Sequence, residues 1–217
     1  MVEYGKKVSA GKVCRLTKSM SLPKTSTVKP VAVYVKHKTN EDMEYANRLK
    51  QRFNPDKPNL VWVGDITYVR VSGKFRYVCV IIDLFSRKVI AYKTSAKINT
   101  KLTLDTFNTA YSKRGFPNGV MFHSDRGCQY TSKDFRMALD KAEYVQSFSA
   151  KGRPFDNAVA ESFFKYLKKE ELNRNNYNNV NELNMSLFEY IEGFYNKRRP
   201  HSANNFLSPD EKEDSFV

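Results

Sequence analysis

Three consecutive stretches between residues 60 and 95 constrain the fold of this chain most. They read LVWVGDITYVRV, FRYVCVIIDLF and VIAYKTS, and the short segments SGK and SRK lie between them. Stretches rich in β-branched and aromatic residues, separated by turn residues, are typical of antiparallel strands. We therefore expect a three-stranded meander, with the apolar run from Val78 to Ile82 covered on both faces of the sheet.

After residue 95 the sequence alternates between helical and strand patterns. We expect a helix over residues 99–114, a strand over 119–124, a helix that Ser132 caps, and a strand over 144–149. Two long helical patterns follow, over residues 156–174 and 180–197. The order βββαβαβα predicts an α/β fold in which a mixed five-stranded sheet is flanked by helices.

The first 54 residues predict a basic appendage that precedes this core. Residues 1–52 contain 12 Lys and Arg against 4 Asp and Glu, whereas the other 165 residues contain 25 against 19. A short helical pattern starts after Ser9, a proline-punctuated stretch follows, and residues 42–53 give a second short helical pattern. The excess charge favours nucleic acid as the partner, with a solubilising tail as the alternative.

The composition also limits where the protein is expected to act. The longest apolar run is too short to span a bilayer, and the first residues lack a signal-peptide core. Three distant cysteines, Cys14, Cys79 and Cys128, predict neither a disulfide framework nor a zinc site. We expect a cytoplasmic protein, associated with the nucleoid if the host is bacterial, and no membrane partner.

Three carboxylates are candidates for a catalytic metal site. Asp65 is expected in mid-strand, where an unpaired buried charge is unfavourable; Asp125 follows the fourth strand, and Glu161 begins a helix. Singly, such residues are more often turn formers or solvated helix positions. If the first and fourth strands are neighbours, however, the three carboxylates converge. They would then hold Mg²⁺ or Mn²⁺, with two ions expected, for in-line attack at phosphorus.

Helical spacing adds basic residues to the same candidate site. Glu161, Lys165 and Lys168 fall on one helical face, and Val159, Phe163 and Leu167 fall on another. One face would hold metal and phosphate while the other anchors the helix to the sheet. An ordinary salt bridge between Glu161 and Lys165 explains the first pair equally well, but it does not explain the two aspartates.

Several motifs resemble, in order and spacing, the insertion-sequence transposases whose core is similar to retroviral integrase. They are WVGDITYV, VIIDLFSRKVIAY, FHSDRGCQYTS, FSAKGRPFDNAVAESFFKYLKKEEL and YNKRRPH followed by SPDE. The resemblance covers about residues 55–213. Between Asp125 and Glu161 lie 35 residues, which is the interval of the Asp-Asp-Glu motif of this family.

The resemblance implies a ribonuclease-H-like core at residues 55–213, preceded by a basic arm at 1–54 with a partial helix-turn-helix and a linker, and followed by a tail at 214–217. It implies that Asp65, Asp125 and Glu161 bind Mg²⁺ or Mn²⁺ for nicking at transposon ends and transfer of the 3′-hydroxyl into target DNA. The residues expected at the DNA are Lys168, Lys165, Asn157, Arg126 and His201, although His201 could also simply pack. A homo-oligomer on DNA is expected.

Two further hypotheses stay open at this point. A nuclease of the same fold would hydrolyse DNA without joining it, and a non-catalytic DNA-binding remnant or regulator would do neither. Since residues 1–22 resemble only the last helix of an upstream module, a DNA-binding protein from a preceding frame, or a fusion with it, is an expected partner. The role of His123, as a site residue or a structural one, and that of Asp83, as a ligand or a turn residue, remain alternatives.

Overall fold

The computed structural model describes residues 9–20 and 45–216, and the chain divides into two units, residues 1–40 and 41–217. In the first unit, helix α1 (Ala10–Ser19) begins after Ser9, whose hydroxyl accepts a hydrogen bond from the backbone N–H of Lys12. This cap agrees with the sequence prediction.

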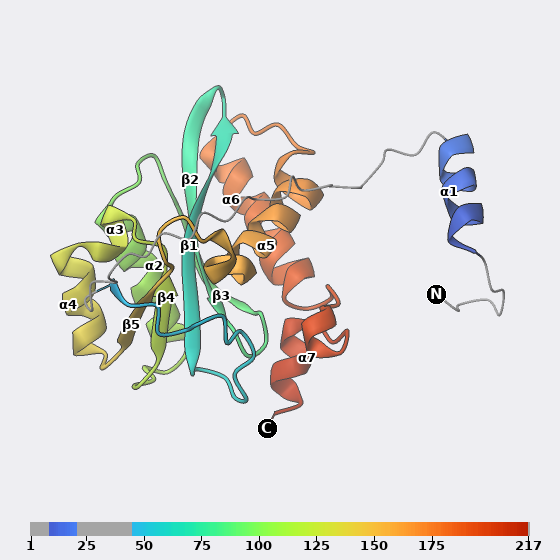
Figure 1. The fold of residues 1–217 in the computed structure, drawn as a ribbon. Coiled ribbons are helices and arrows are strands. Elements are labelled where there is room, and N and C mark those ends of the chain that lie inside the picture. The colour runs from blue at the N-terminus through green and yellow to red at the C-terminus, as the bar shows by residue number, and fades with distance from the viewer. Residues whose placement is uncertain (1–8, 21–44, 217) are drawn as a thin grey trace. The chain divides into compact units, whose positions relative to one another are not determined.

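The second unit contains a five-stranded mixed sheet (Figure 1). Its strands are β1 (Val61–Val71), β2 (Lys74–Asp83), β3 (Val89–Ser95), β4 (Met121–Ser124) and β5 (Val145–Phe148), in the order β3-β2-β1-β4-β5. The first three pair antiparallel, whereas β4 and β5 join in parallel. The predicted meander is confirmed, and so is the predicted neighbourhood of β1 and β4.

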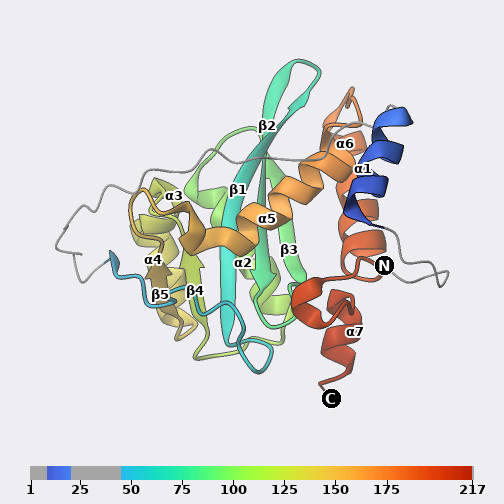
Figure 2. The same ribbon diagram turned by 45° about the vertical axis from the view of Figure 1, so that its right-hand side comes forward.

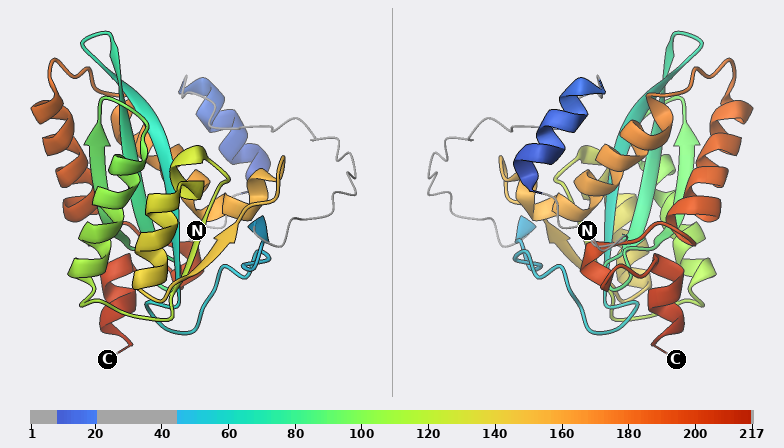
Figure 3. Two further views of the ribbon diagram at one scale, coloured as in Figure 1. Left: turned by 90° about the vertical axis from the view of Figure 1, so that its left-hand side faces the viewer. Right: turned by 90° about the vertical axis from the view of Figure 1, so that its right-hand side faces the viewer.

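Helices cover both faces of the sheet (Figure 3). One layer holds α2 (Thr100–Lys113), α3 (Cys128–Thr131) and α4 (Lys133–Lys141), and its core includes Trp62, Phe107 and Phe122. The other layer holds α5 (Ala158–Leu167) and α6 (Val180–Phe188), which continue as the π-helical segments η3 (Lys168–Leu172) and η4 (Glu189–Tyr195). Short 3₁₀ turns, η2 (Pro154–Asn157) and η5 (Ser202–Asn204), precede α5 and the last helix.

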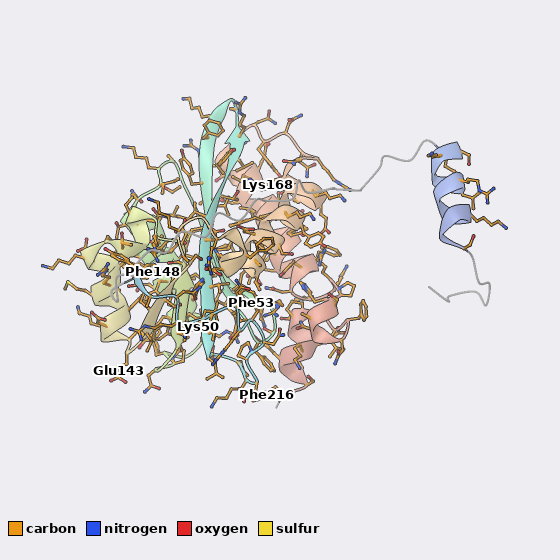
Figure 4. The ribbon with its side chains drawn as sticks, in the orientation of Figure 1. Lys50, Phe53, Glu143, Phe148, Lys168 and Phe216 are labelled. Carbon is orange, nitrogen blue, oxygen red and sulfur yellow. The ribbon has the colours of Figure 1, made fainter. Side chains whose placement is uncertain are left out.

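Helix α7 (Pro209–Asp214) ties the C-terminal region to the end of the sheet opposite to Lys168 (Figure 4). Glu213 accepts hydrogen bonds from Arg114, Ser86 and Lys88, and Arg114 also lies 3.7 Å from the buried Asp83. Asn204, in a position where the family resemblance suggests an apolar residue, is buried and donates to the Ser86 carbonyl at 2.7 Å. A polar network therefore closes this end of the core.

The sequence pattern predicts a short helix over residues 42–53. Residues 45–53, the described part of this range, do not form it. A turn lies there instead, in which Lys50 and Gln51 have left-handed φ values of 46° and 60°. Leu49 is buried in the core of the second unit, so packing of this one apolar side chain overrides the helical pattern. Among the described residues, no helix is long and apolar enough to cross a membrane.

Candidate active site

The pairing of β1 with β4 brings the two candidate aspartates together. The parallel ladder ends at the pair Val63 and His123. Asp65 lies two residues further along β1, and Asp125 lies two residues further along the chain, just past the end of β4. Glu161 stands in the first turn of α5, which crosses β1 (Figure 2). All three carboxylates line one pocket of about 590 Å³, together with residues of the loop at 149–157.

Asp65 is the most strongly perturbed carboxyl in this pocket. Its pKa is raised to about 7, first by burial and also by the negative charges of Asp125 and Glu161, against the opposing effects of the Ile66 N–H and Lys168. The Ile66 N–H donates to Oδ1 at 2.8 Å. A carboxyl with these surroundings is partly protonated near pH 7, and a bound cation would favour its charged form.

Gly127 shapes the turn that carries Asp125. Its backbone N–H donates to Asp125 Oδ1 at 2.9 Å, which orients the carboxylate. A Cβ atom at this position would lie 2.3 Å from Nε2 of Gln129 and 2.9 Å from Asp125 Oδ1. The φ of Gly127 is −61°, so close approach of side chains, not a left-handed backbone, explains the glycine.

Helix α5 separates an anchoring face from an open face, as its spacing predicts. Phe163 and Leu167 are buried in the core, whereas Glu161 and Lys165 are exposed. The regular α-helix ends at Leu167, and the π-helical turn begins at Lys168. Lys168 is near enough to Asp65 to lower the pKa of that carboxyl, so it belongs to the surroundings of the pocket.

The chemistry of the pocket fits a hard divalent cation. Its walls supply three carboxylates, and Asn157, which is buried, has a side-chain Oδ1 without a hydrogen-bond partner among the described residues. Carboxylate and amide oxygens are the ligands that Mg²⁺ and Mn²⁺ prefer. In the described part of the chain, no three His, Cys, Asp or Glu side chains are already close enough to hold a metal ion. The donor types therefore fit, while the side chains would have to draw together.

His123 is a buried structural residue. Its Nδ1 lies 2.9 Å from the Ser147 hydroxyl, and its Nε2 lies 3.1 Å from the Ser149 hydroxyl. Because Ser147 Oγ already accepts the N–H groups of Arg48 and Leu49, its own proton is directed to Nδ1. The ring is then neutral with its proton on Nε2, in keeping with burial lowering the pKa of His123 to about 4.

Asp156 supports the loop at 149–157, although sequence reasoning did not select it. Its Oδ2 accepts from the Ala150 N–H at 3.0 Å, and its Oδ1 accepts from Gln51 Nε2 at 2.8 Å. The side chain is buried. Ser147 and Ser149 were also not selected, although their hydroxyls hold His123. Their alternation toward one face, at the end of β5 and just past it, was the available signal.

The other candidate DNA contacts do not all lie in the carboxylate pocket. Asn157 and Arg126 line the pocket with the carboxylates. The Arg126 guanidinium donates to the carbonyls of Ser149 and Tyr45, at 3.1 and 3.2 Å. It thereby also joins the loop at 149–157 to Tyr45, near the start of the second unit. His201 lies apart, in a second pocket, with its ring edge-on to Tyr195 at 4.8 Å.

The remaining residues of interest, Asp83, Tyr130, Phe155 and Cys128, do not line the carboxylate pocket. Asp83 is buried and accepts the N–H groups of Asn59 and Phe85, at 2.8 and 3.0 Å, which makes it a turn residue outside the carboxylate pocket. Tyr130 is buried in the core, and Phe155 and Cys128 are exposed. Tyr130 therefore packs in the core.

Comparisons with known proteins agree with this geometry. Two family profiles, each described as an integrase core domain, match residues 55–154 and 143–209. The magnesium complex of the HTLV-2 integrase catalytic core domain, in its trimeric form, superposes with a TM-score of 0.56 at 18% identity, over 74% of this chain and 99% of that one. A catalytic core of BIV integrase gives 0.53 at 15% identity, over 73% and 95%. The fold is the ribonuclease-H-like fold of integrase cores.

Sequence relatives narrow this class to a family. The transposase of insertion sequence element IS904 from Lactococcus lactis is 38% identical over 167 residues, which are 77% of this chain and 66% of the relative. The transposase InsF of insertion sequence IS3A from Escherichia coli is 40% identical over 167 residues, or 77% and 58%. The chain belongs to the integrase-core family of insertion-sequence transposases. It spans about three-fifths to two-thirds of the length of these relatives.

Proposed function

We propose that the chain is the catalytic subunit of a DNA transposase, which nicks transposon ends and transfers the freed 3′-hydroxyl into target DNA. The observation that carries this proposal is the opening of Asp65, Asp125 and Glu161 into one pocket, beside the basic Lys168. The named functions of the relatives support it.

The three carboxylates and the Asn157 amide would hold one or two Mg²⁺ or Mn²⁺ ions. Such ions, when bound, activate an attacking oxygen and stabilise the leaving oxygen at phosphorus. The magnesium in the HTLV-2 integrase core supports this choice of metal. Gly127 would fix the position of the Asp125 carboxylate by its N–H, and Asp156 would hold the loop that faces the DNA.

Basic residues would position the DNA. Lys168 would contact a phosphate close to the cut, and Lys165, one helical turn before it on the exposed face of α5, would contact the same strand. Asn157 and Arg126 would contact DNA from the pocket wall. The place of His201 in a separate pocket favours packing for that residue.

The partners would be transposon ends, target DNA and further copies of the chain. A solved structure of a simian T-cell lymphotropic virus intasome, in complex with a PP2A regulatory subunit, superposes with a TM-score of 0.58 at 18% identity, over 74% of this chain and 56% of that one. Assembly on DNA is the part that we carry over. A DNA-binding protein from a preceding frame, or a fusion with it, would complete end recognition, and the protein would act in the cytoplasm at the nucleoid.

A joining assay tests this proposal. Wild-type protein is incubated with a labelled duplex of the element's end, a supercoiled plasmid and Mn²⁺ or Mg²⁺, and nicked and joined products are separated. We expect both products from the wild type and neither from Glu161→Gln. The control Glu143→Gln changes an exposed glutamate at the opposite end of the sheet (Figure 4) and should leave both steps intact. Nicking without joining would establish the nuclease alternative, and neither step in the wild type would favour the non-catalytic one.

A further inference from the structure

The β1–β2 hairpin extends beyond the rest of the sheet and has two unlike faces. Beyond Val63, β1 has no ladder to β4, and the residues from Tyr68 to Arg70 pair only with β2 (Figure 1). Alternation of side chains along the strand buries Val69 and Val71 in the core beneath α5 and α6. The opposite face is open, since Tyr68 is 57% exposed and Phe75 is 45% exposed.

Cations and aromatic rings alternate on this open face. The rings of Tyr68 and Phe75 meet edge-on, with centroids 5.3 Å apart. The Arg70 guanidinium carbon lies 5.1 Å from the Phe75 centroid, and Lys168 Nζ lies 4.8 Å from that of Tyr68. We call these four residues, Tyr68, Arg70, Phe75 and Lys168, the hairpin platform. Within the described parts of the chain, neither Arg70 nor Lys168 is in a salt bridge.

The hairpin platform is held rigidly, although two-stranded ribbons are usually marginal by themselves. Val71 forms a parallel bridge with Tyr177, and the Ser72 N–H donates to the Tyr177 carbonyl at 2.9 Å. The Ser72 hydroxyl also donates to the Asn178 carbonyl, at 2.5 Å. Binding therefore does not have to include the entropy cost of ordering this surface. Exposed rings that are already in place are effective anchors for a ligand.

We propose that the hairpin platform binds unpaired nucleotides of the DNA strand that adjoins the cut. Rings on which bases can stack, interleaved with cations that can contact phosphates, are the features that recognise single-stranded nucleic acid. Lys168 joins the platform to the carboxylate pocket, because it contacts Tyr68 and also acts on Asp65. Tyr68 lies three positions beyond Asp65 along β1, or about 10 Å. That is the length of roughly three nucleotides in one strand of a duplex.

This assignment of a substrate rests on the proposed function, but its test does not require catalysis. Binding of the full chain is measured by fluorescence anisotropy in EDTA, with a fully paired duplex and with the same duplex frayed by three unpaired nucleotides at one end. The ratio of the two dissociation constants removes the contribution of the basic arm, which contacts both DNAs alike. We expect the wild type to bind the frayed duplex roughly tenfold more tightly.

The variants locate this preference. Tyr68→Ala and Phe75→Ala should each reduce the ratio several-fold and together bring it close to one, whereas Tyr68→Phe, which keeps a ring, should preserve it. Tyr68→Leu replaces the ring if Tyr68→Ala fails to fold. The matched control is Phe116→Ala, since Phe116 is 62% exposed and also in an edge-on pair, with Tyr111, before the start of β4. A wild type without preference, or hairpin variants with the wild-type ratio, would overturn the proposal.

The two proposals fail separately in this design. Glu161→Gln should keep the binding ratio of the wild type while losing nicking and joining. A protein that shows the ring-dependent ratio but neither nicks nor joins would refute the proposed catalytic function alone. A protein that nicks and joins, with a ratio that the rings do not affect, would refute the hairpin platform alone and leave its rings available to a protein partner.

Discussion

Val63 of β1 is paired with His123 of β4, and this pair fixes the spacing of the catalytic candidates. Because parallel strands keep their register, Asp65 and Asp125, two residues further on, open into the same pocket as Glu161. His123 itself is held by Ser147 of β5 and by Ser149, which directly follows that strand. The pocket thus depends on buried polar contacts beneath it as well as on its own carboxylates.

His123→Ala should reduce the stability of the core. The substitution leaves the hydroxyls of Ser147 and Ser149 without the ring, in a fully buried place, and opens a cavity. Together these effects should lower the free energy of unfolding by about 3 kcal/mol. Urea denaturation followed by tryptophan fluorescence of Trp62 measures the change. An unfolding free energy equal to that of the wild type would show that these contacts do not stabilise the fold.

Gly127→Ala should impair catalysis more than folding. The new Cβ would meet Asp125 Oδ1 and the end of the Gln129 side chain, which can move only at the expense of its own contacts. We expect a loss of stability of about 1 kcal/mol, together with at least tenfold slower nicking. Gly193→Ala, where nothing lies within 4 Å of the added atom, is the matched control. Equal rates for both variants would contradict the role of Gly127.

Glu213→Gln should change the dependence of stability on pH. Burial raises the pKa of Glu213, but the hydrogen bonds and charges of Arg114, Ser86 and Lys88 outweigh it, so the folded pKa lies below its usual value. A lowered folded pKa contributes stability above the unfolded pKa of about 4.3, and this contribution disappears as the pH falls through the folded pKa.

The wild type should therefore lose more stability than Glu213→Gln between about pH 5 and pH 3. At neutral pH the variant should be less stable by about 3 kcal/mol, because Arg114, in a largely buried place, keeps only the more distant Asp83 as a charged partner. Thermal unfolding followed across this pH range makes the comparison, with the exposed Glu143→Gln as control. Parallel pH curves for wild type and Glu213→Gln would be evidence against the network.

Lys168→Ala should weaken DNA binding and make it less sensitive to salt. One lost phosphate contact lowers the slope of log binding constant against log salt concentration by about 0.9 for duplex DNA. Lys101→Ala is a suitable control, since Lys101 is 79% exposed and pairs with Asp105 on the other layer of helices. If the slope of the Lys168 variant equals that of the control, Lys168 does not contact phosphate.

Local sequence patterns predicted the strands and helices because period and turn residues act within a few positions. The order of the elements predicted that β1 and β4 are neighbours, and this prediction was enough to place Asp65 beside Asp125. Contacts between distant segments could not be predicted in this way. The turn at Lys50, the α7 network around Glu213 and the bracing of Ser72 by Tyr177 all depend on tertiary packing. The hairpin platform was hidden for the same reason, since Lys168 and Tyr68 are 100 positions apart.

Binding of Mn²⁺ to the full chain, measured by isothermal titration calorimetry without DNA, tests the central claim most directly. The claim is that Asp65, Asp125 and Glu161 form one divalent-cation site, and this measurement depends neither on the recognised end sequence nor on a partner. We expect wild-type protein to bind Mn²⁺, and Asp65→Asn, Asp125→Asn and Glu161→Gln each to bind it at least tenfold more weakly, while Glu143→Gln binds as the wild type does. Undiminished Mn²⁺ binding by the three variants would contradict the account.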